Sequence, residues 1–209
     1  MAGMTQRLED VRKRAQRILQ EANVLLEGHF DYGNGYHGRV YLNPHMLFCH
    51  PSTIWQLAQD LLDIIPYDTT TRVQAVVGPV TGGALLAHTL AGLLDGRRSL
   101  QHPPCVFAPI HVDQEEGLQL RPAYARMLAG TRVLIADDVR NTGKTFSHCA
   151  ELIRKAGGEV IATATIYDRM ATLEALDVPD IALLEYRASD IYASPMCPQC
   201  ADGVALTRF

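Results

Sequence analysis

The 209-residue sequence has no long apolar run and no segment typical of secretion. A membrane-spanning helix needs about 20 consecutive apolar residues, and no stretch of the chain approaches that length. The N-terminus mixes arginines with acids and lacks the apolar core of a signal peptide. We therefore expect a cytoplasmic protein without a membrane segment.

A strong excess of one charge is also absent. The formal net charge is −4 at pH 7, which argues against broad binding to nucleic acid because such binding depends on a basic surface. Lysine is scarce: only Lys13, Lys144 and Lys155 occur among the 19 basic residues. A site for a polyanion would have to rely on arginines, backbone N–H groups or a metal ion.

The five cysteines are an odd number and do not resemble a disulfide framework. The Cys-Pro-X-Cys stretch from Cys197 to Cys200 has the spacing of half a zinc site, but structural zinc requires four ligands. No second pair of this kind exists, and His45, Cys49 and His50 would complete a site only if the fold brought them close. A reduced thiol pair is the default expectation, and zinc at Cys197 and Cys200 is the less favoured alternative.

The composition, 47% hydrophobic and 20% charged, suits one globular domain with a sizeable core. From Val73 onward short apolar strands alternate with helical segments, which predicts a parallel sheet with helices on both faces. The expected strands are 73–77, 105–110, 132–136, 160–167 and 181–185, and the expected helices are 81–94, 145–156 and 171–176.

The segment before Val73 is predicted to be less regular. Apolar residues from Leu8 onward recur at helical steps and predict an amphipathic helix that ends near Gly28. Residues 28–38 are rich in Gly, His, Tyr and Asn, and predict a loop or hairpin rather than core. Also expected are a short strand at 39–42, a helix from near Ser52 to before Pro66 and a mobile loop at 111–124.

Residues 133–146 are the most informative stretch of the chain. A short apolar strand, 133–136, is followed by two adjacent carboxylates, Asp137 and Asp138. The turn 140–145 then offers backbone N–H groups at a helix N-terminus, which is a natural phosphate site. Open α/β sheets bind ligands at the carboxyl ends of their strands, where the acids would accept hydrogen bonds from hydroxyls. The pattern predicts a site for a sugar phosphate.

Two alternatives fit this stretch less well. The sequence Gly143-Lys144-Thr145 mimics the end of a P-loop, but the position that must be glycine five residues earlier is Asp138. Its carboxylate would face the phosphates. A turn that binds no ligand stays open as the second alternative, although two acids directly after a buried strand are costly without a purpose.

A second Gly-rich turn, Gly-Pro-Val-Thr-Gly-Gly at 78–83, also lies between a predicted strand and a helix. Its glycines would let the backbone approach a ligand and leave N–H groups pointing outward. Alone this is a weak signal, because such turns are common. Together with 137–145 it places two anion sites beside a hydroxyl-binding acid pair, which describes a ribose carrying phosphate at one end and pyrophosphate at the other.

The stretch 137–145 resembles the phosphoribosyl-pyrophosphate (PRPP) signature of type I phosphoribosyltransferases, and 78–83 resembles their pyrophosphate loop. The match covers roughly residues 28–200. The resemblance implies an α/β fold, with a Rossmann-like parallel-sheet core and a small hood built from the N-terminal and C-terminal segments. It implies one domain, 1–209, with the hood largely in 1–45 and 186–209 and the core in about 46–185.

The resemblance also implies the chemistry. A nitrogen base displaces pyrophosphate from the anomeric carbon of PRPP, which is bound with Mg²⁺. Asp137 and Asp138 would be the catalytic pair on the ribose hydroxyls, and Mg²⁺ would be held through PRPP, with these two acids as further possible ligands. The PRPP-binding residues it implies are Val139, Arg140, Asn141, Thr142, Gly143, Lys144, Thr145, Thr81, Gly82 and Gly83.

Within that family the chain is most similar to orotate phosphoribosyltransferases. The N-terminal helix is followed by a Gly-rich loop and Tyr-Leu-Asn at 41–43, Asp168-Arg169 follows a strand, and Cys-Pro-X-Cys lies near the C-terminus. The resemblance assigns Arg169 to the carboxylate of the base, which a guanidinium binds with two parallel hydrogen bonds. A surface arginine at a strand end is the alternative.

The mobile loop departs from the orotate pattern, which places lysines there. The corresponding stretch 111–117 has three acids and no lysine, and leaves His111, Arg121 and Arg126 as candidates for that role. The histidines and aromatics at 29–37 would either cover the base or pack the hood onto the sheet.

The predicted function is that of a PRPP-dependent pentosyltransferase of nucleotide metabolism. Orotate is the first choice of base, with orotidine 5′-phosphate of pyrimidine biosynthesis as the product. A purine-type phosphoribosyltransferase and a non-catalytic PRPP-binding regulator are the alternatives. A homodimer is expected, and neither nucleic acid nor membrane is expected as a partner.

Overall fold

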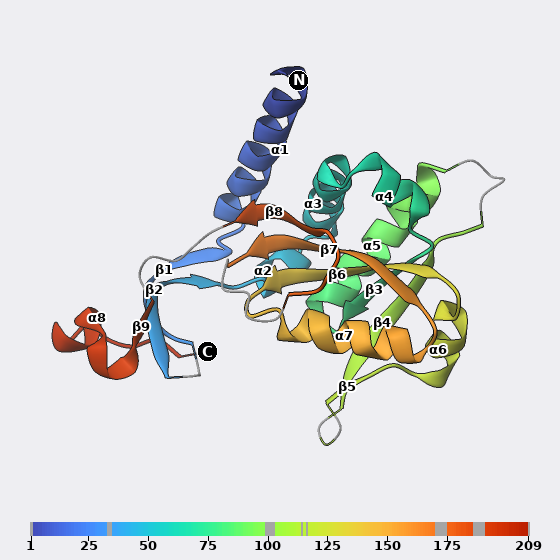
Figure 1. The fold of residues 1–209 in the computed structure, drawn as a ribbon. Coiled ribbons are helices and arrows are strands. Elements are labelled where there is room, and N and C mark those ends of the chain that lie inside the picture. The colour runs from blue at the N-terminus through green and yellow to red at the C-terminus, as the bar shows by residue number, and fades with distance from the viewer. Residues whose placement is uncertain are drawn as a thin grey trace.

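The computed structural model describes residues 2–32, 35–98, 103–113, 115, 117–169, 175–185 and 191–208. Its larger sheet has six strands in the order β5-β4-β3-β6-β7-β8 (Figure 1). The five strands from β4 to β8 in this order are parallel, and β5 pairs with β4 as an antiparallel edge strand. The strands are β3 Ala75–Pro79, β4 Val106–Asp113, β5 Gly117–Gln119, β6 Arg132–Arg140, β7 Glu159–Asp168 and β8 Asp180–Glu185.

Helices cover both faces of this sheet (Figure 1). Successive side chains of a strand point to opposite faces, so Val76 and Leu134 pack with the helices α3 Pro51–Ile64 and α5 Gly82–Gly96. Val77 and Ile135 pack on the other face with α7 Lys144–Lys155 and with the last residue of α6 Pro122–Leu128. Strands buried on both faces are apolar throughout, which is why the alternation of strands and helices could be predicted.

A smaller antiparallel sheet joins the two ends of the chain. It has the order β1-β2-β9 and consists of β1 Leu25–Asp31, β2 Tyr36–Leu42 and β9 Ile191–Ala193. A single bridge between Phe30 and Thr207 adds the last described residues to it. This sheet is the hood expected from the sequence, whereas the exact division of the chain into hood and core stays a prediction. The remaining elements are α1 Ala2–Glu21, α2 His45–Phe48, α4 Tyr67–Arg72, η1 Ser194–Met196 and α8 Pro198–Ala201.

The N-terminal helix ends earlier than its apolar pattern predicted. Helix α1 stops at Glu21, and Asn23 adopts the left-handed conformation with φ of 51°, which asparagine tolerates better than most residues. Leu25 and Leu26, which fit the helical pattern, belong to β1 and pair with Leu42 and Tyr41. Pairing between strands has therefore overridden the helical spacing of these two leucines.

The segment 28–38 forms the predicted hairpin, but its exclusion from the core was wrong. His29, Phe30 and His37 are all buried, with exposed fractions of 2%, 4% and 5%. The polar composition of the segment concealed this burial, because both of its histidines have partners inside the hood.

The segment 111–124 contains more regular structure than the predicted loop. Strand β4 continues to Asp113, β5 follows, and α6 begins at Pro122. Helix α4 was not predicted at all. The helix expected at 171–176 lies mostly outside the described residues.

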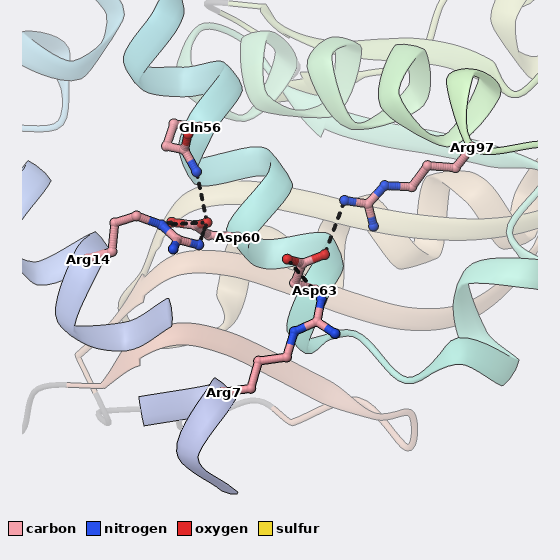
Figure 2. Close-up of polar contacts among 6 residues, drawn as sticks. All are labelled: Arg7, Arg14, Gln56, Asp60, Asp63 and Arg97. Atoms are coloured by element: carbon pink, nitrogen blue, oxygen red, sulfur yellow. Dashed lines mark hydrogen bonds and ion pairs between the residues drawn. The ribbon is translucent and has the colours of Figure 1, made fainter. Parts of the chain in front are cut away.

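Ion pairs fix α1 to the larger sheet's helical layer (Figure 2). The fully buried carboxylate of Asp60 in α3 accepts hydrogen bonds from Arg14 Nε to both oxygens at 3.1 Å, and from Gln56 Nε2 at 3.0 Å. An unpaired buried carboxylate would cost several kcal/mol. These hydrogen-bond donors offset the cost of burying the Asp60 carboxylate beneath α1. Nearby, Asp63 pairs with Arg7 and Arg97 at 3.3 and 3.1 Å.

Among the described helices, none combines the length and apolar character of a membrane span.

Candidate active site

A cavity of about 880 Å³ opens at the carboxyl end of the parallel sheet, under the hood. It lies where β3, β6 and β7 end and where α5 and α7 begin, which is the edge predicted for ligand binding. Among the residues singled out by the sequence, it is lined by Thr81, Gly82, Asp137, Asp138, Val139, Arg140, Asn141, Thr142, Gly143, Lys144, Thr145 and Arg169.

The acid pair lies inside strand β6 rather than after it, which corrects the predicted end of that strand at residue 136. Asp137 is in register with Thr165 of β7, and the ladder continues to Arg140. The Asp138 N–H donates to Asp137 Oδ1 at 2.9 Å, and the Val139 N–H donates to Asp138 Oδ1 at 2.8 Å. The two carboxylates are thus held in place by the backbone of the next residue.

Burial raises the pKa of the Asp137 carboxyl well above its ordinary value, and the adjacent Asp138 carboxylate raises it further. Its side chain is only 8% exposed. Two carboxylates side by side in a poorly solvated place favour sharing a proton. Such a pair gains from ligands that donate hydrogen bonds or bring positive charge.

The turn before α5 packs directly onto the acid pair. A Cβ atom on Gly82 would lie 2.2 Å from Asp138 Oδ2, and one on Gly83 would lie 2.6 Å from Asp137 Oδ1. Only glycine therefore fits at these two positions. The peptide between Val80 and Thr81 is cis. The predicted anion turn and the predicted hydroxyl-binding acids are consequently neighbours in one site, although Gly83 itself does not line the cavity.

The turn before α7 presents its backbone to the same cavity. Gly143 has φ of 85° and forms the N-cap of the helix, a left-handed conformation that glycine adopts without steric cost. The first N–H groups of a helix have no partner within the helix, and here they face a cavity with no acid in the first turn of α7. Together with exposed Thr142, Lys144 and Thr145, they form a site suited to an anion.

The side chain of Arg140 serves the protein interior, which restricts its predicted role as a PRPP ligand to its backbone. Its guanidinium is 2% exposed and donates to Asp168 Oδ2 at 2.9 Å and to Thr163 Oγ1 at 2.8 Å. It also pairs with Asp180 and lies 4.5 Å from the ring centre of Phe146. This network fastens the end of β6 to β7, β8 and α7.

Arg169 follows β7 and points at the hood. Its guanidinium carbon lies 5.3 Å from the ring centre of Tyr32, within the range of a cation–π contact. Its backbone N–H donates to the Arg140 carbonyl at 3.0 Å, which continues the β6–β7 pairing by one residue. The arginine is therefore positioned between the sheet and the hood, on the wall of the cavity.

The residues expected in the mobile loop are not brought to the cavity. His111 pairs with Gln119 within the β4–β5 hairpin, and its Nε2 atom is buried without a hydrogen-bond partner among the described residues. Arg121 is exposed at the start of α6. Neither lines the cavity, whereas Val112, Gly117 and Leu118 of the same hairpin do.

The aromatics at 29–37 were expected either to cover the base or to pack the hood onto the sheet, and no other hood residue was expected in the cavity wall. Asp31, Tyr32, Tyr41 and Leu42 of the β1–β2 hairpin all line it. The Tyr32 hydroxyl donates to the Val40 carbonyl across the hairpin. The aromatic residues of this segment already indicated a role in the site. Only the structure distinguishes Tyr32, which contacts Arg169, from its buried neighbour Phe30.

The arrangement agrees with comparisons to known proteins. The model of the phosphoribosyl transferase domain family matches residues 54–195. The chain belongs to this family. By family it is a PRPP-dependent phosphoribosyltransferase.

Curated relatives are named orotate phosphoribosyltransferase. The protein of that name from Carboxydothermus hydrogenoformans is 29% identical over 92% of this chain and 94% of its own. Orotate phosphoribosyltransferase 2 from Mesorhizobium japonicum is 32% identical over 88% of this chain and 90% of its own. These relatives extend the similarity beyond the family model into the N-terminal hood.

Solved structures show the same fold. The orotate phosphoribosyltransferase from Aeropyrum pernix has a TM-score of 0.63 at 23% identity, and covers 81% of this chain and 92% of its own. The adenine phosphoribosyltransferase from Saccharomyces cerevisiae has a TM-score of 0.58 at 18% identity, and covers 81% of this chain and 99% of its own. Enzymes for different bases share this fold, so the choice of base depends on the site rather than on the fold.

Proposed function

We propose that this phosphoribosyltransferase transfers ribose 5-phosphate from PRPP to orotate and releases pyrophosphate. The observation that carries the proposal is the single cavity in which Asp137 and Asp138 lie between two helix N-termini, with Arg169 and Tyr32 on the hood side. This is one site for a donor with an anionic group at each end and for a planar acceptor that carries a carboxylate.

The donor would lie along the carboxyl end of the sheet. Asp137 and Asp138 accept hydrogen bonds from the 2′- and 3′-hydroxyls, which act as donors to a carboxylate. The turn 141–145 holds the 5′-phosphate at the N-terminus of α7. The turn 81–83 receives the pyrophosphate beside the acid pair, where Gly82 allows a close approach of the backbone.

The residues present fit a role for Mg²⁺. Carboxylate oxygens are hard ligands of the kind that Mg²⁺ takes together with phosphate oxygens and water, and both Asp137 and Asp138 line the cavity. When bound, Mg²⁺ would supply charge neutralisation to the pyrophosphate. It would also favour ionisation of Asp137, whose pKa burial raises.

The acceptor would lie between the sheet and the hood. Arg169 can bind a carboxylate through its planar fork, and the ring of Tyr32 limits access of water to that ion pair. The relatives that share the hood are named for orotate, a base that carries a carboxylate. Arg169 is therefore the residue that we assign to base recognition.

The reaction exchanges one bond at the anomeric carbon. The carbon–oxygen bond to pyrophosphate breaks, and its electron pair leaves with pyrophosphate. The acceptor nitrogen loses its proton to solvent and uses its electron pair to form the new carbon–nitrogen bond. Positive charge grows on the ribose ring meanwhile, so the carboxylates of Asp137 and Asp138 stabilise the transition state more than the ground state.

A PRPP-binding regulator is the second candidate. It is favoured by the β4–β5 hairpin, where residues 111–117 contain three acids and no lysine. The test is pyrophosphate release by the protein with Mg²⁺, PRPP and orotate, measured against the same mixture without base. Catalysis predicts release that depends on the base. Saturable PRPP binding without such release would favour the regulator.

The α7 turn should determine affinity for the 5′-phosphate. In Gly143→Ala a methyl group occupies a left-handed residue, and we expect about tenfold weaker binding of ribose 5-phosphate by calorimetry. Gly130→Ala is the matched control, because Gly130 has φ of 73°, is exposed and does not line the cavity. Both variants should lose about 1 kcal/mol of stability.

Only Gly143→Ala should show a lower affinity for ribose 5-phosphate. Both variants should bind pyrophosphate as tightly as the wild type does. An equal loss of affinity for both ligands would mean that the two anion sites are assigned wrongly.

We also propose, from the family resemblance, that the protein is a cytoplasmic homodimer. Light scattering on the purified protein tests the oligomeric state.

A further inference from the structure

Four side chains of types that can bind a metal ion meet in the described part of the hood, far from the acid pair in the chain. They are His29 of β1, His37 of β2, and Cys197 and Cys200 at the start of and within α8. One ligand atom from each lies within 4.8 Å of the other three. Three of the residues are buried, only Cys200 is exposed, and both cysteines are free thiols.

Four of the six distances between these atoms are close to those of a tetrahedral site, and none of the six exceeds 4.8 Å. His29 Nε2 lies 3.3 Å from His37 Nδ1, 3.4 Å from Cys197 Sγ and 3.7 Å from Cys200 Sγ. His37 Nδ1 lies 3.2 Å from Cys200 Sγ. A tetrahedral zinc ion with bonds of about 2.0–2.1 Å to nitrogen and about 2.3 Å to sulfur separates its ligand atoms by about 3.3–3.8 Å. The four atoms therefore lie close enough together to bind one ion.

The other nitrogen of His29 has a partner that orients the ring. His29 Nδ1 lies 2.9 Å from the carbonyl oxygen of Val204, and a carbonyl can only accept a hydrogen bond. The neutral ring therefore carries its proton on Nδ1, and Nε2 presents a lone pair to His37 and the two sulfurs. Metal-binding histidines commonly have such a hydrogen bond from the second nitrogen to a carbonyl or carboxylate.

We propose that His29, His37, Cys197 and Cys200 bind one structural Zn²⁺ ion. Two thiolates and two imidazoles in a tetrahedral arrangement select zinc among the common divalent ions, and four protein ligands leave no open position for catalysis. Zinc at Cys197 and Cys200 was the less favoured expectation from the sequence. The histidines precede the cysteines by 160 to 171 positions in the chain. Among the described residues, Cys49 and His50 do not join the cluster.

The site would tie the C-terminal segment to the N-terminal hairpin. The same contact includes a hydrogen bond from the Thr207 N–H to the His29 carbonyl at 2.7 Å, and one from Gln199 Nε2 to the Gly28 carbonyl at 3.2 Å. Asp31 and Tyr32, which line the cavity, follow His29 along the chain. Zinc would thus hold the hood wall in place without contacting substrate. The proposal does not depend on which base is used.

The experiment is metal analysis of the full-length protein, purified without chelator under reducing conditions. We expect about one zinc per chain in the wild type, and below about one-tenth in Cys197→Ser with Cys200→Ser. Cys49→Ser is the matched control, because it removes an exposed cysteine outside the cluster, and it should retain the full zinc content.

A second measurement covers the case in which the double variant fails to fold. Wild-type protein is stripped of metal with a chelator, reduced, and titrated with Co²⁺. We expect saturation at about one equivalent, with the strong visible absorption of tetrahedral cobalt and a near-ultraviolet thiolate-to-metal band. Added Zn²⁺ should abolish both.

Three results would overturn the proposal. The first is a wild-type protein that contains no stoichiometric metal and shows no saturable Co²⁺ binding. The second is a cobalt-bound protein whose spectrum lacks the thiolate-to-metal band. The third is a loss of zinc in Cys49→Ser equal to that in the double variant. The first would leave the cluster as a network of hydrogen bonds between thiols and imidazoles.

Discussion

Replacing both acids of the pair, in Asp137→Asn with Asp138→Asn, is expected to lower PRPP-dependent turnover by about a thousandfold or more. Removing one preorganised electrostatic group from a transition state typically costs a hundred- to a thousandfold, and here two carboxylates beside the developing positive charge are removed. Asparagine keeps the oxygen that accepts the N–H of the following residue, so the backbone geometry should persist.

Stability should move in the opposite direction at neutral pH. The pKa of Asp137 is raised in the folded protein, chiefly by burial and then by Asp138. A carboxyl with a raised folded pKa contributes stability that is fully present below its ordinary pKa of about 4. That contribution is lost as the pH rises through the folded value. Asp137→Asn should therefore melt at or above the wild-type temperature at pH 7, with a smaller difference at pH 4.

Calorimetric titration with PRPP and thermal melts at several pH values check both parts. Unchanged PRPP affinity in the double variant would contradict the assignment of the acids to the ribose. A large fall in melting temperature at pH 7 would show that the pair is needed for folding.

Arg169→Ala is expected to weaken the use of orotate by about ten- to a hundredfold in kcat/KM. Loss of a charge-assisted hydrogen bond in a poorly hydrated pocket costs about 1.5–3 kcal/mol. PRPP affinity should change little, because the donor binds the two helix N-termini and the acid pair. Arg169→Lys should recover only part of the loss, since lysine lacks the planar fork.

Uracil is the control substrate, because it resembles orotate without the carboxylate, and its low activity should not depend on Arg169. Arg154→Ala is the control variant, since Arg154 is exposed in the last turn of α7 and does not line the cavity. Equal losses with orotate in Arg169→Ala and Arg154→Ala would remove the basis for the orotate assignment.

The parts of the site that could be predicted are encoded locally. The stretch 133–145 contains an apolar strand, two acids and a turn that begins a helix, and the structure places them together at one edge of the sheet. A parallel strand buried on both faces must be apolar, so the end of that run marks the edge of the sheet. The exact end of β6 could not be predicted from the sequence, because pairing with β7 extends the strand through the acids to Arg140.

The parts that could not be predicted depend on residues far apart in the chain. The guanidinium of Arg140 seemed available to a ligand, yet Asp168 and Asp180 occupy it. Cys197 and Cys200 lacked two zinc ligands until the hood placed His29 and His37 beside them. In both cases the local sequence identifies the chemical group, but its partner is determined by tertiary packing.

The most direct test of the account is a competition between bases. The protein is incubated with Mg²⁺, limiting PRPP and equal concentrations of orotate, uracil, adenine, hypoxanthine and guanine, and the nucleotides formed are identified by mass. Because the bases compete, the product ratio reports the ratio of their kcat/KM values. The account predicts orotidine 5′-phosphate as the dominant product. A purine nucleotide as the dominant product, or no nucleotide at all, would contradict it.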